Sequence, residues 1–193
     1  MIDRKEHKMT FEEKTISSEM IYEGKILNLR RDKVTTVDGT SYREIIEHNG
    51  AVCIAAITDS GNMVMVKQYR KPLERVVLEV PAGKIDGDEE PLSAAIRELK
   101  EETGYEAKHI QHLSRFYPSV AYCKELIHLF LCTGLVPGET HFDDNEAIDI
   151  EEYSIDYLYD KVMKGELEDA KTLIAILTVK ALQTEGKLEI QKK

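Results

Sequence analysis

The pattern of apolar and polar positions predicts a mixed α/β chain built on buried strands. Ala51–Thr58 is an almost unbroken apolar run, which is typical of a strand buried on both faces. Asp59–Asn62 predicts a turn, and Met63–Tyr69 predicts the partner strand that follows it. Two further apolar runs predict strands at Val76–Val80 and Leu126–Cys132. These segments together predict a sheet at the centre of the protein.

Three segments carry a helical pattern. They are Pro91–Thr103, Ile155–Met163 and Asp169–Thr184. Pro91 suits the first turn of its helix, and Gly104 suits the C-terminal cap. Because strands and helices do not alternate along the chain as regular βαβ units, a doubly wound fold is a poor fit.

Residues 15–48 predict short strands with little apolar material between them. Val34–Val37 leads into Asp38-Gly39, a hairpin turn signal, and Tyr42–Glu47 predicts the returning strand. A hairpin with so few apolar residues is not stable alone, because two strands bury too little surface. We therefore expect this segment to pack on something else, a second copy of itself being one option.

Composition and charge narrow the class of protein. The chain has 193 residues, which suits one domain, or one domain with a small appendage. Its formal net charge of −10 gives no electrostatic footprint for duplex DNA or an anionic membrane. The longest apolar stretch, Ala51–Ile57, is far shorter than the roughly 20 residues of a spanning helix. The first residues are charged and show no apolar signal core, so we expect a cytoplasmic protein.

Cysteine usage excludes two kinds of structural site. The chain has three cysteines and no CxxC motif. An odd number without paired spacing favours neither a disulfide framework nor a zinc site.

The predicted helix from residue 91 carries an unusual group of carboxylates. Glu98 and Glu102 are four residues apart and lie one turn above the other, with Glu101 on the adjoining flank. Like charges at this spacing cost a helix a few tenths of a kcal/mol per pair, which a bound cation would offset. Oxygen ligands without His or Cys favour Mg²⁺ or Mn²⁺ over zinc. An acidic run is also typical of a solvated helix face, so the carboxylates alone leave both interpretations open.

The apolar residues of this helix predict its buried side. One face, expected to pack on the sheet, carries Leu92, Ala95, Ile96, Leu99 and Thr103.

The spacing of the whole segment resembles a known family. The pattern G-x5-E-x7-R-E-U-x-E-E-x-G-U, in which U is a bulky apolar residue, is the Nudix box. Its fixed positions are matched by Gly83, Glu89, Arg97, Glu98, Glu101, Glu102 and Gly104. Leu99 fills the first U position, and Tyr105 fills the last with an aromatic side chain of similar bulk. The chain therefore resembles the Nudix hydrolase superfamily.

This resemblance implies a fold and a reaction. The implied fold belongs to the α/β class. It is a Nudix-type α/β/α sandwich around a mixed β-sheet, with an N-terminal antiparallel β-hairpin subdomain. The resemblance places a β-hairpin and dimerisation subdomain over residues 1–48 and a Nudix hydrolase domain over residues 49–193. Members of the family cleave a nucleoside diphosphate linked to another group.

The resemblance also implies roles for the box residues. Glu98, Glu101 and Glu102 would hold the catalytic cations, with the backbone carbonyl of Ala82 as a further ligand. In the same resemblance Gly83 would allow a tight loop, which Arg97 and Glu89 would brace.

Sequences flanking the box are similar to the ADP-ribose pyrophosphatase branch of the family. The matching segments are Tyr42–Ala51, Val66–Glu74, Leu78–Asp86 and Asp169–Leu173. The branch implies Mg²⁺-dependent cleavage of ADP-ribose to AMP and ribose 5-phosphate, with Mn²⁺ as a substitute metal. It also implies a homodimer whose N-terminal hairpins are exchanged. Neither nucleic acid nor a membrane is expected as a partner.

One loop departs from the branch. Pro118 and Ser119 stand where the branch has a Ser-Pro-Gly loop, but Val120-Ala121 replaces Pro-Gly. Ser119 is a candidate substrate-binding residue, and Pro118 as a plain turn residue is the alternative. This departure leaves open another nucleoside diphosphate sugar or nucleotide as substrate. A non-catalytic ADP-ribose sensor is the remaining alternative.

Further candidates lie outside the box. Arg70 is the first candidate for binding phosphate and Arg43 the second, because a guanidinium matches phosphate oxygens bidentately. A surface salt bridge is the alternative for both. By resemblance to the late acidic loop of the branch, Glu146 is the candidate general base or extra metal ligand, with Asp144 second. A solvated acidic loop is the alternative there.

Aromatic residues for the nucleobase are less well defined. Tyr22 and Tyr42 could stack on a base, and core packing explains either one equally well. Glu125 follows at the family's spacing and would help to order the site.

Overall fold

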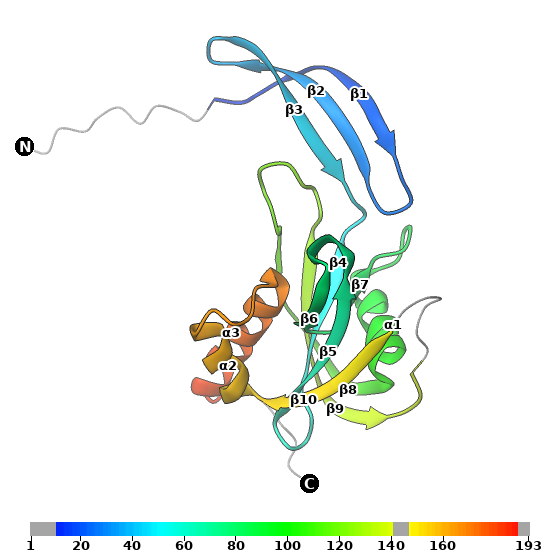
Figure 1. Cartoon of the computed structure of the whole chain (residues 1–193), viewed down its shortest axis with the longest axis vertical. Coiled ribbons are helices and arrows are strands. Elements are labelled where there is room, and N and C mark those ends of the chain that lie inside the picture. Colours follow the sequence, from blue (N-terminus) through cyan, green and yellow to red (C-terminus); the bar gives the residue numbers. More distant parts are fainter. Residues whose placement is uncertain (1–10, 141–146, 189–193) are drawn as a thin grey trace, which may run out of the picture. The chain divides into compact units, whose positions relative to one another are not determined.

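The computed structural model describes residues 11–140 and 147–188 (Figure 1). The chain divides into two compact units. One contains the residues up to 48 together with 119–125, and the other contains 49–118 and 126–193. The two units are described separately below.

The N-terminal unit is a three-stranded antiparallel sheet. Its strands follow one another in the order β1 (Thr15–Glu23), β2 (Asn28–Thr36) and β3 (Gly39–Glu47). Gly39 has φ +135°, which an L side chain rarely adopts, so the Asp38-Gly39 turn needs glycine there. The predicted hairpin turn is confirmed, with Thr36 paired to Gly39.

This N-terminal sheet buries very little. Every residue of β1 is exposed. Within the described part of the unit, Asp32 and Val34 on β2 are the two buried residues. Asp32 is held there by two hydrogen bonds from the Arg30 guanidinium, of 2.9 and 3.1 Å. A sheet with this exposure has too little buried apolar surface to be stable alone.

The second unit is built on a four-stranded mixed sheet with the order β7-β4-β9-β8. The central strands β4 and β9 are parallel, and the outer strands are antiparallel to them. The bounds are Ala51–Ala56 for β4, Ala82–Lys84 for β7, Tyr105–Phe116 for β8 and Ile127–Pro137 for β9.

A second, antiparallel sheet has the order β10-β5-β6. Its strands are β5 (Asn62–Arg70), β6 (Arg75–Glu79) and β10 (Ile148–Ser154). The end of β5 lies beside the start of β6, since Arg70 pairs with Arg75, and Glu79 at the end of β6 pairs with Val66. A 3₁₀ turn, η1 (Lys71–Leu73), joins them.

The helices are α1 (Pro91–Thr103), α2 (Ile155–Met163) and α3 (Ala170–Thr184). The predicted bounds of α1 and α2 are confirmed. α3 begins one residue later than predicted because Asp169 is its N-cap, whose carboxylate accepts a 3.0 Å hydrogen bond from Thr172 N.

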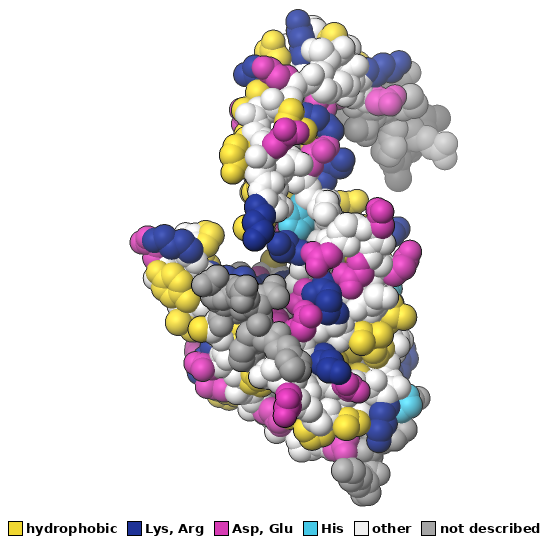
Figure 2. All heavy atoms as spheres, turned by 90° about the vertical axis from the view of Figure 1, so that its right-hand side faces the viewer, with side chains coloured by type: hydrophobic (Ala, Val, Ile, Leu, Met, Phe, Trp, Pro, Cys, Tyr) yellow, Lys and Arg dark blue, Asp and Glu magenta, His cyan; other side chains and the backbone are white. Residues whose placement is uncertain are grey.

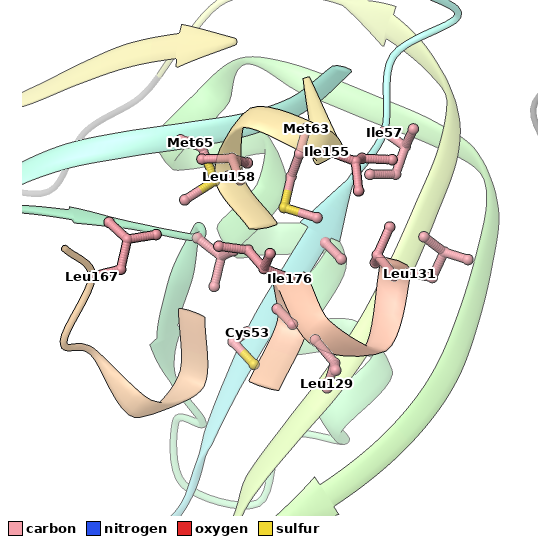
Figure 3. Close-up of a cluster of buried hydrophobic side chains, with 14 of the residues drawn as sticks. Cys53, Ile57, Met63, Met65, Leu129, Leu131, Ile155, Leu158, Leu167 and Ile176 are labelled. Carbon is pink, nitrogen blue, oxygen red and sulfur yellow. The ribbon is translucent and has the colours of Figure 1, made fainter. Parts of the chain in front are cut away.

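The core lies on both faces of β4, as its apolar run predicts. Cys53 and Ala55 face a cluster that includes residues of α2 and α3 (Figure 3). Val52 and Ile54 face a second cluster that includes Leu99 of α1. Successive side chains of a strand point to opposite faces, so β4 separates two helical layers. The structure is therefore the predicted α/β/α sandwich around a mixed sheet.

The predicted buried face of α1 is partly wrong. Leu92 and Ile96 are each 48% exposed, whereas Ala94 and Glu102 are buried. Small side chains let the helix backbone approach the sheet closely. The buried side of α1 is thus set by close packing and by the partner of Glu102, which an apolar pattern does not report.

Two strands were missed. β8 mixes exposed and half-buried positions without a regular period, and it is an edge strand. β7 is three residues long and lies where the Val76–Val80 strand was expected to end and the resemblance implied a tight loop. Among the described residues, no helix is long and apolar enough to cross a membrane.

Candidate active site

The candidate site begins where β7 leads toward α1. Pro81 O accepts a 2.8 Å hydrogen bond from Ile54 N, which fixes this segment to β4. One residue later, Ala82 N donates a 2.9 Å hydrogen bond to Glu102 Oε2. Glu102 is 5% exposed, so this bond gives a buried carboxylate a partner on the neighbouring strand. The two bonds set β7 beside the carboxylate side of α1.

Glycine at position 83 is required by close contact. A Cβ built there would lie 1.9 Å from Glu98 Cδ, which no real pair of atoms tolerates. The backbone of β7 therefore lies directly against the Glu98 carboxylate. The resemblance implied a tight loop at Gly83, and the geometry gives a specific reason for it.

Arg97 organises the carboxylates of α1. Its Nη1 donates to Glu98 Oε1 at 2.7 Å and to Glu101 Oε2 at 3.0 Å. Its Nε and Nη2 hold both oxygens of Glu89, at 3.2 and 2.9 Å. Nη2 also donates to the backbone carbonyl of Lys84 at 3.0 Å. One guanidinium thus ties the loop after β7 to the helix.

The charge of this cluster is unbalanced. The hydrogen bonds that Arg97 donates to Glu89 are the main cause that raises the pKa of Arg97, and Glu98 and Glu101 add to it. In return, Arg97 lowers the pKa of Glu89. Arg97 hydrogen-bonds three carboxylates here, and a fourth, that of Asp86, lies 3.9 Å from its Nη2. The buried Glu102 carboxylate lies on the same helix. The cluster carries excess negative charge, which favours an additional cation.

The residues present fit a hard divalent cation. The candidate ligands Glu98, Glu101, Glu102 and the carbonyl of Ala82 all offer oxygen, which Mg²⁺ and Mn²⁺ prefer. Gly83 keeps the space beside Glu98 clear of a side chain. In the described ranges, no three Asp, Glu, His or Cys side chains form a ready-made metal site. Arg97, which occupies oxygens of Glu98 and Glu101, accounts for that arrangement.

Arg70 lies at the end of β5 in a second charged cluster. Its Nε and Nη2 donate to the two oxygens of Glu79 at 2.6 and 2.7 Å. The Glu79 side chain is 3% exposed and that of Arg70 is 39% exposed. The structure therefore gives Arg70 a carboxylate partner that the sequence analysis did not name, while its side chain stays partly exposed.

Glu79 has a second cation. Lys171 Nζ hydrogen-bonds Glu79 Oε2 and lies 3.0 Å from Asp169 Oδ2. Burial alone would raise the pKa of Glu79, but the bonds from Arg70 and the charge of Lys171 outweigh it and lower that pKa. Glu79 is thus a buried, ionised carboxylate between two cations.

The sequence contained a signal for this second cluster. Glu79 and Lys171 both lie in segments that match the ADP-ribose pyrophosphatase branch, Leu78–Asp86 and Asp169–Leu173. Nothing in a single sequence shows that residues 92 positions apart share a hydrogen bond. The pairing of Glu79 with Lys171 follows only from the way in which β6 and α3 pack in the folded protein.

The remaining candidates lie elsewhere. Arg43 and Ser119 belong to the N-terminal unit. Arg43 donates to Glu13 Oε2 at 2.8 Å and to Tyr42 O at 2.9 Å. Ser119 O accepts a 3.1 Å hydrogen bond from Cys123 N. Glu146 and Asp144 lie outside the described residues.

Other predicted residues of the N-terminal unit have local partners. Glu125 Oε1 lies 4.0 Å from His48 Nδ1. Tyr22 and Tyr42 are both exposed, which argues against core packing within the unit, and the Arg31 guanidinium lies 5.3 Å from the centre of the Tyr42 ring.

The charged surface agrees with an acidic protein. On the face drawn in Figure 2, acidic and basic side chains are interspersed over the described residues instead of gathering into a basic area.

Comparison with known proteins agrees with this geometry. The family model described as "NUDIX domain" matches residues 47–175. The model described as "Nucleoside diphosphate sugar hydrolase N-terminal domain" matches residues 13–43. A solved structure described as an ADP compounds hydrolase superposes with a TM-score of 0.83 and 20% identity, covering 94% of this chain and 100% of its own. At that identity the likeness concerns the fold.

Two relatives are similar over most of their length. An ADP-ribose pyrophosphatase from Bacillus subtilis (strain 168) is 41% identical over 95% of this chain and 99% of its own. A methanol dehydrogenase activator from Bacillus methanolicus is 43% identical over 86% of this chain and 91% of its own. With the family model matched across the sandwich and relatives of this identity, the chain belongs to the NUDIX domain family.

Proposed function

We propose that the protein hydrolyses the pyrophosphate bond of ADP-ribose to give AMP and ribose 5-phosphate, with Mg²⁺ as cofactor. The observation that carries the proposal is the α1 carboxylate cluster, held by Arg97 and laid against the backbone of Gly83. The near full-length similarity to the Bacillus subtilis ADP-ribose pyrophosphatase supports the choice of substrate.

The cation would be held by Glu98, Glu101, Glu102 and the carbonyl of Ala82, and Mn²⁺ would substitute for Mg²⁺. When bound, a divalent cation neutralises phosphate charge and activates a water for attack at phosphorus. An acidic chain that binds a diphosphate needs such a local reversal of charge.

The side chains of the site have complementary tasks. Arg97 fixes the rotamers of Glu98 and Glu101 and joins them through Glu89 to the loop, so the ligands are ordered before substrate arrives. Arg70, whose side chain is partly exposed, would donate hydrogen bonds to the diphosphate. Arg43 and Ser119 remain proposed substrate-binding residues. Glu146 remains the proposed general base, on a segment outside the described residues.

We also propose a homodimer formed through the N-terminal sheet. Support comes from the exposed apolar side chains of β1, which a partner would cover. They include Ile16, Met20 and Ile21. Light scattering on the purified protein tests this, with a monomer at micromolar concentration as the contradicting result. We further propose a cytoplasmic location, in keeping with three free thiols.

The alternative is hydrolysis of another nucleoside diphosphate sugar. It is favoured by Val120, which departs from the branch pattern and is 85% exposed. Because the Val120 side chain packs against little else, packing does not fix the residue type at this position. A substitution there can instead alter the choice of substrate. A sensor without catalysis is less well supported, because the charged positions of the box are all present.

The test is hydrolysis of ADP-ribose, ADP-glucose, GDP-mannose, NADH and 8-oxo-dGTP in Mg²⁺, with products separated by chromatography. The proposal expects ADP-ribose to give AMP and ribose 5-phosphate with the highest kcat/KM. A different preferred substrate would support the alternative. ADP-ribose binding without turnover in Mg²⁺ or Mn²⁺ would support the sensor.

A further inference from the structure

The segment Asp169–Leu173 contains a charged residue that the reaction described so far does not use. Lys171, the second residue of α3, has a side chain only 14% exposed. A lysine this buried is uncommon unless it is paired. Its partners are Glu79 on β6 and the α3 N-cap, Asp169. Lys171 therefore brings a positive charge from α3 to the carboxylate that holds Arg70.

Glu79 is shared between two cations that differ in exposure. Arg70 donates hydrogen bonds to both carboxylate oxygens of Glu79, and Lys171 donates a further one to Oε2. The pair uses Nε and Nη2 of Arg70, which leaves Nη1 outside the bidentate contact. The Arg70 side chain is 39% exposed, against 14% for Lys171. Of the two cations that share Glu79, Arg70 is therefore the more exposed.

Asp169 is paired with Lys171, and its charge is a minor cause of the raised pKa of Arg70, after the larger effects of Glu79 and Glu102. Its Oδ2 accepts hydrogen bonds from Thr172 N at 3.0 Å and from Thr172 Oγ1 at 2.6 Å. These donors and the N-terminal end of α3 stabilise its charge locally. Asp169 thus anchors Lys171, while Glu79 links Lys171 to Arg70.

The cluster is joined to the carboxylate site. Val80 N, which follows Glu79, donates a 2.9 Å hydrogen bond to Thr172 Oγ1. Two residues later, Ala82 N donates to Glu102. The charge of Glu102 is also among the causes that raise the pKa of Arg70, after the larger effect of Glu79. Arg70 is therefore within electrostatic reach of the site to which its partners are fixed.

We propose that Lys171 is a positioning residue that keeps Arg70 available to a diphosphate by sharing the Glu79 carboxylate. Without Lys171, Glu79 would pair with Arg70 alone. Its negative charge would then cancel more of the positive charge that Arg70 offers to an approaching phosphate. With Lys171 in place, Arg70 both stays oriented by Glu79 and keeps positive charge for the substrate. The inference rests on the proposed function, since it needs a diphosphate ligand at this site.

The experiment compares Lys171→Met with Lys171→Arg and Lys180→Met. Lys180 is a matched control, because it is also on α3 but pairs with the exposed Asp156. Steady-state kinetics with ADP-ribose and Mg²⁺ give kcat and KM. Calorimetry gives the affinity for α,β-methylene ADP-ribose, an analogue that is not cleaved.

The inference expects a specific split between binding and turnover. Lys171→Met raises KM and weakens analogue binding by about 10-fold, while kcat changes by less than about 3-fold, because Arg70 binds ground state and transition state alike. Lys171→Arg stays within about 3-fold of the wild type, since it restores the charge. Lys180→Met does not change either constant. Unchanged KM and affinity in Lys171→Met would overturn the inference.

A double variant tests whether Lys171 acts on Arg70 through Glu79. It also keeps the inference testable if Lys171→Met alone does not fold. With Glu79→Gln as background, the carboxylate that links Lys171 to Arg70 is gone, so adding Lys171→Met changes the affinity by less than about 2-fold. A loss of about 10-fold on that background would overturn the inference. If the wild type neither cleaves nor binds ADP-ribose, the proposed function and this inference both fail. If the wild type does both and Lys171→Met matches it, this inference alone fails.

Discussion

Two arginines of the second unit hold carboxylates in opposite balances of charge. Arg97 is one cation among three carboxylates on the surface of α1 and its loop. Glu79 is one buried carboxylate between two cations, Arg70 and Lys171. The first cluster has negative charge left over for a metal ion, whereas the second offers the partly exposed side chain of Arg70 to a phosphate. The same ion-pair chemistry therefore prepares two different ligand-binding roles.

The comparison also separates stability from function. Breaking a buried pair leaves an uncompensated charge, whereas a partly exposed pair is screened by solvent. Changes around Glu79 should therefore affect both the free energy of unfolding and diphosphate binding. Changes around Arg97 should mainly affect metal use. The predictions that follow test this division, starting with the largest expected effect.

Removing charge from the carboxylate cluster should have the largest effect. We expect Glu102→Gln to lower kcat for ADP-ribose hydrolysis by about 100- to 1,000-fold, since a metal ligand and its charge are lost. Glu106→Gln is the control, because Glu106 is exposed on β8 and pairs with the exposed Lys100. Product formation at saturating Mg²⁺ measures both. Equal activity of Glu102→Gln and wild type would show that the carboxylates of α1 do not take part in hydrolysis.

Filling the space beside Glu98 should come next. In Gly83→Ala the new Cβ must displace the Glu98 carboxylate, so we expect about a 100-fold loss of kcat/KM, as for a misplaced catalytic group. Gly165→Ala is the control, because its Cβ meets nothing within 4 Å. Its φ of +71° should cost about 1 kcal/mol of stability and leave activity unchanged. Near-normal turnover in Gly83→Ala would mean that the Glu98 position is not critical.

Exchanging each arginine for lysine should separate the two clusters. Lysine keeps the charge and loses the bidentate fork. We expect Arg97→Lys to raise the Mg²⁺ concentration for half-maximal rate by about 10-fold, with KM for ADP-ribose nearly unchanged. We expect Arg70→Lys to raise KM by about 10-fold, with the Mg²⁺ requirement nearly unchanged. Titrations of metal and substrate measure the two effects.

The exposed Arg75, which pairs with the exposed Glu168, supplies the control for both arginine variants. Arg75→Lys should match the wild type in both titrations. If Arg97→Lys and Arg70→Lys shifted the same constant, the division of roles between the clusters would be wrong.

The smallest effect concerns pH. The pKa of Glu79 is below its ordinary value of 4.5, so its stabilising contribution is complete above 4.5 and is lost as the pH falls through the lowered value. We expect the free energy of unfolding to fall below pH 4.5, and to fall less steeply in Glu79→Gln. Urea unfolding at a series of pH values measures the slope. Parallel slopes would show that Glu79 is not a source of acid sensitivity.

The sequence predicted the positions of these residues along the chain better than their partners. The spacing from Gly83 to Tyr105 identified Arg97 and its carboxylates, because one helix and one loop contain all of them. Glu79 and Lys171 escaped notice because their contact depends on how β6 and α3 pack. Similarly, Leu92 and Ile96 were expected inside, since apolar periodicity does not show that Ala94 and Glu102 occupy the contact with the sheet.

Strands with a clear apolar run were predicted, whereas β7 and β8, at the two edges of the four-stranded sheet, were missed. β4 is buried at every position, so its apolar run was easy to recognise. β8 has polar residues on one face, and its pattern has no strong period. Residue identity thus predicts the centre of this fold well, whereas its edges depend on tertiary pairing.

Binding of Mn²⁺ to the wild type and to a Glu98→Gln/Glu102→Gln variant, followed by electron paramagnetic resonance, tests the central claim most directly. That claim is that the carboxylates on α1 hold the cation used for hydrolysis. The account predicts that the wild type binds Mn²⁺ and that the double variant binds it at least about 10-fold more weakly, while remaining folded. Equal Mn²⁺ binding by both proteins would contradict it.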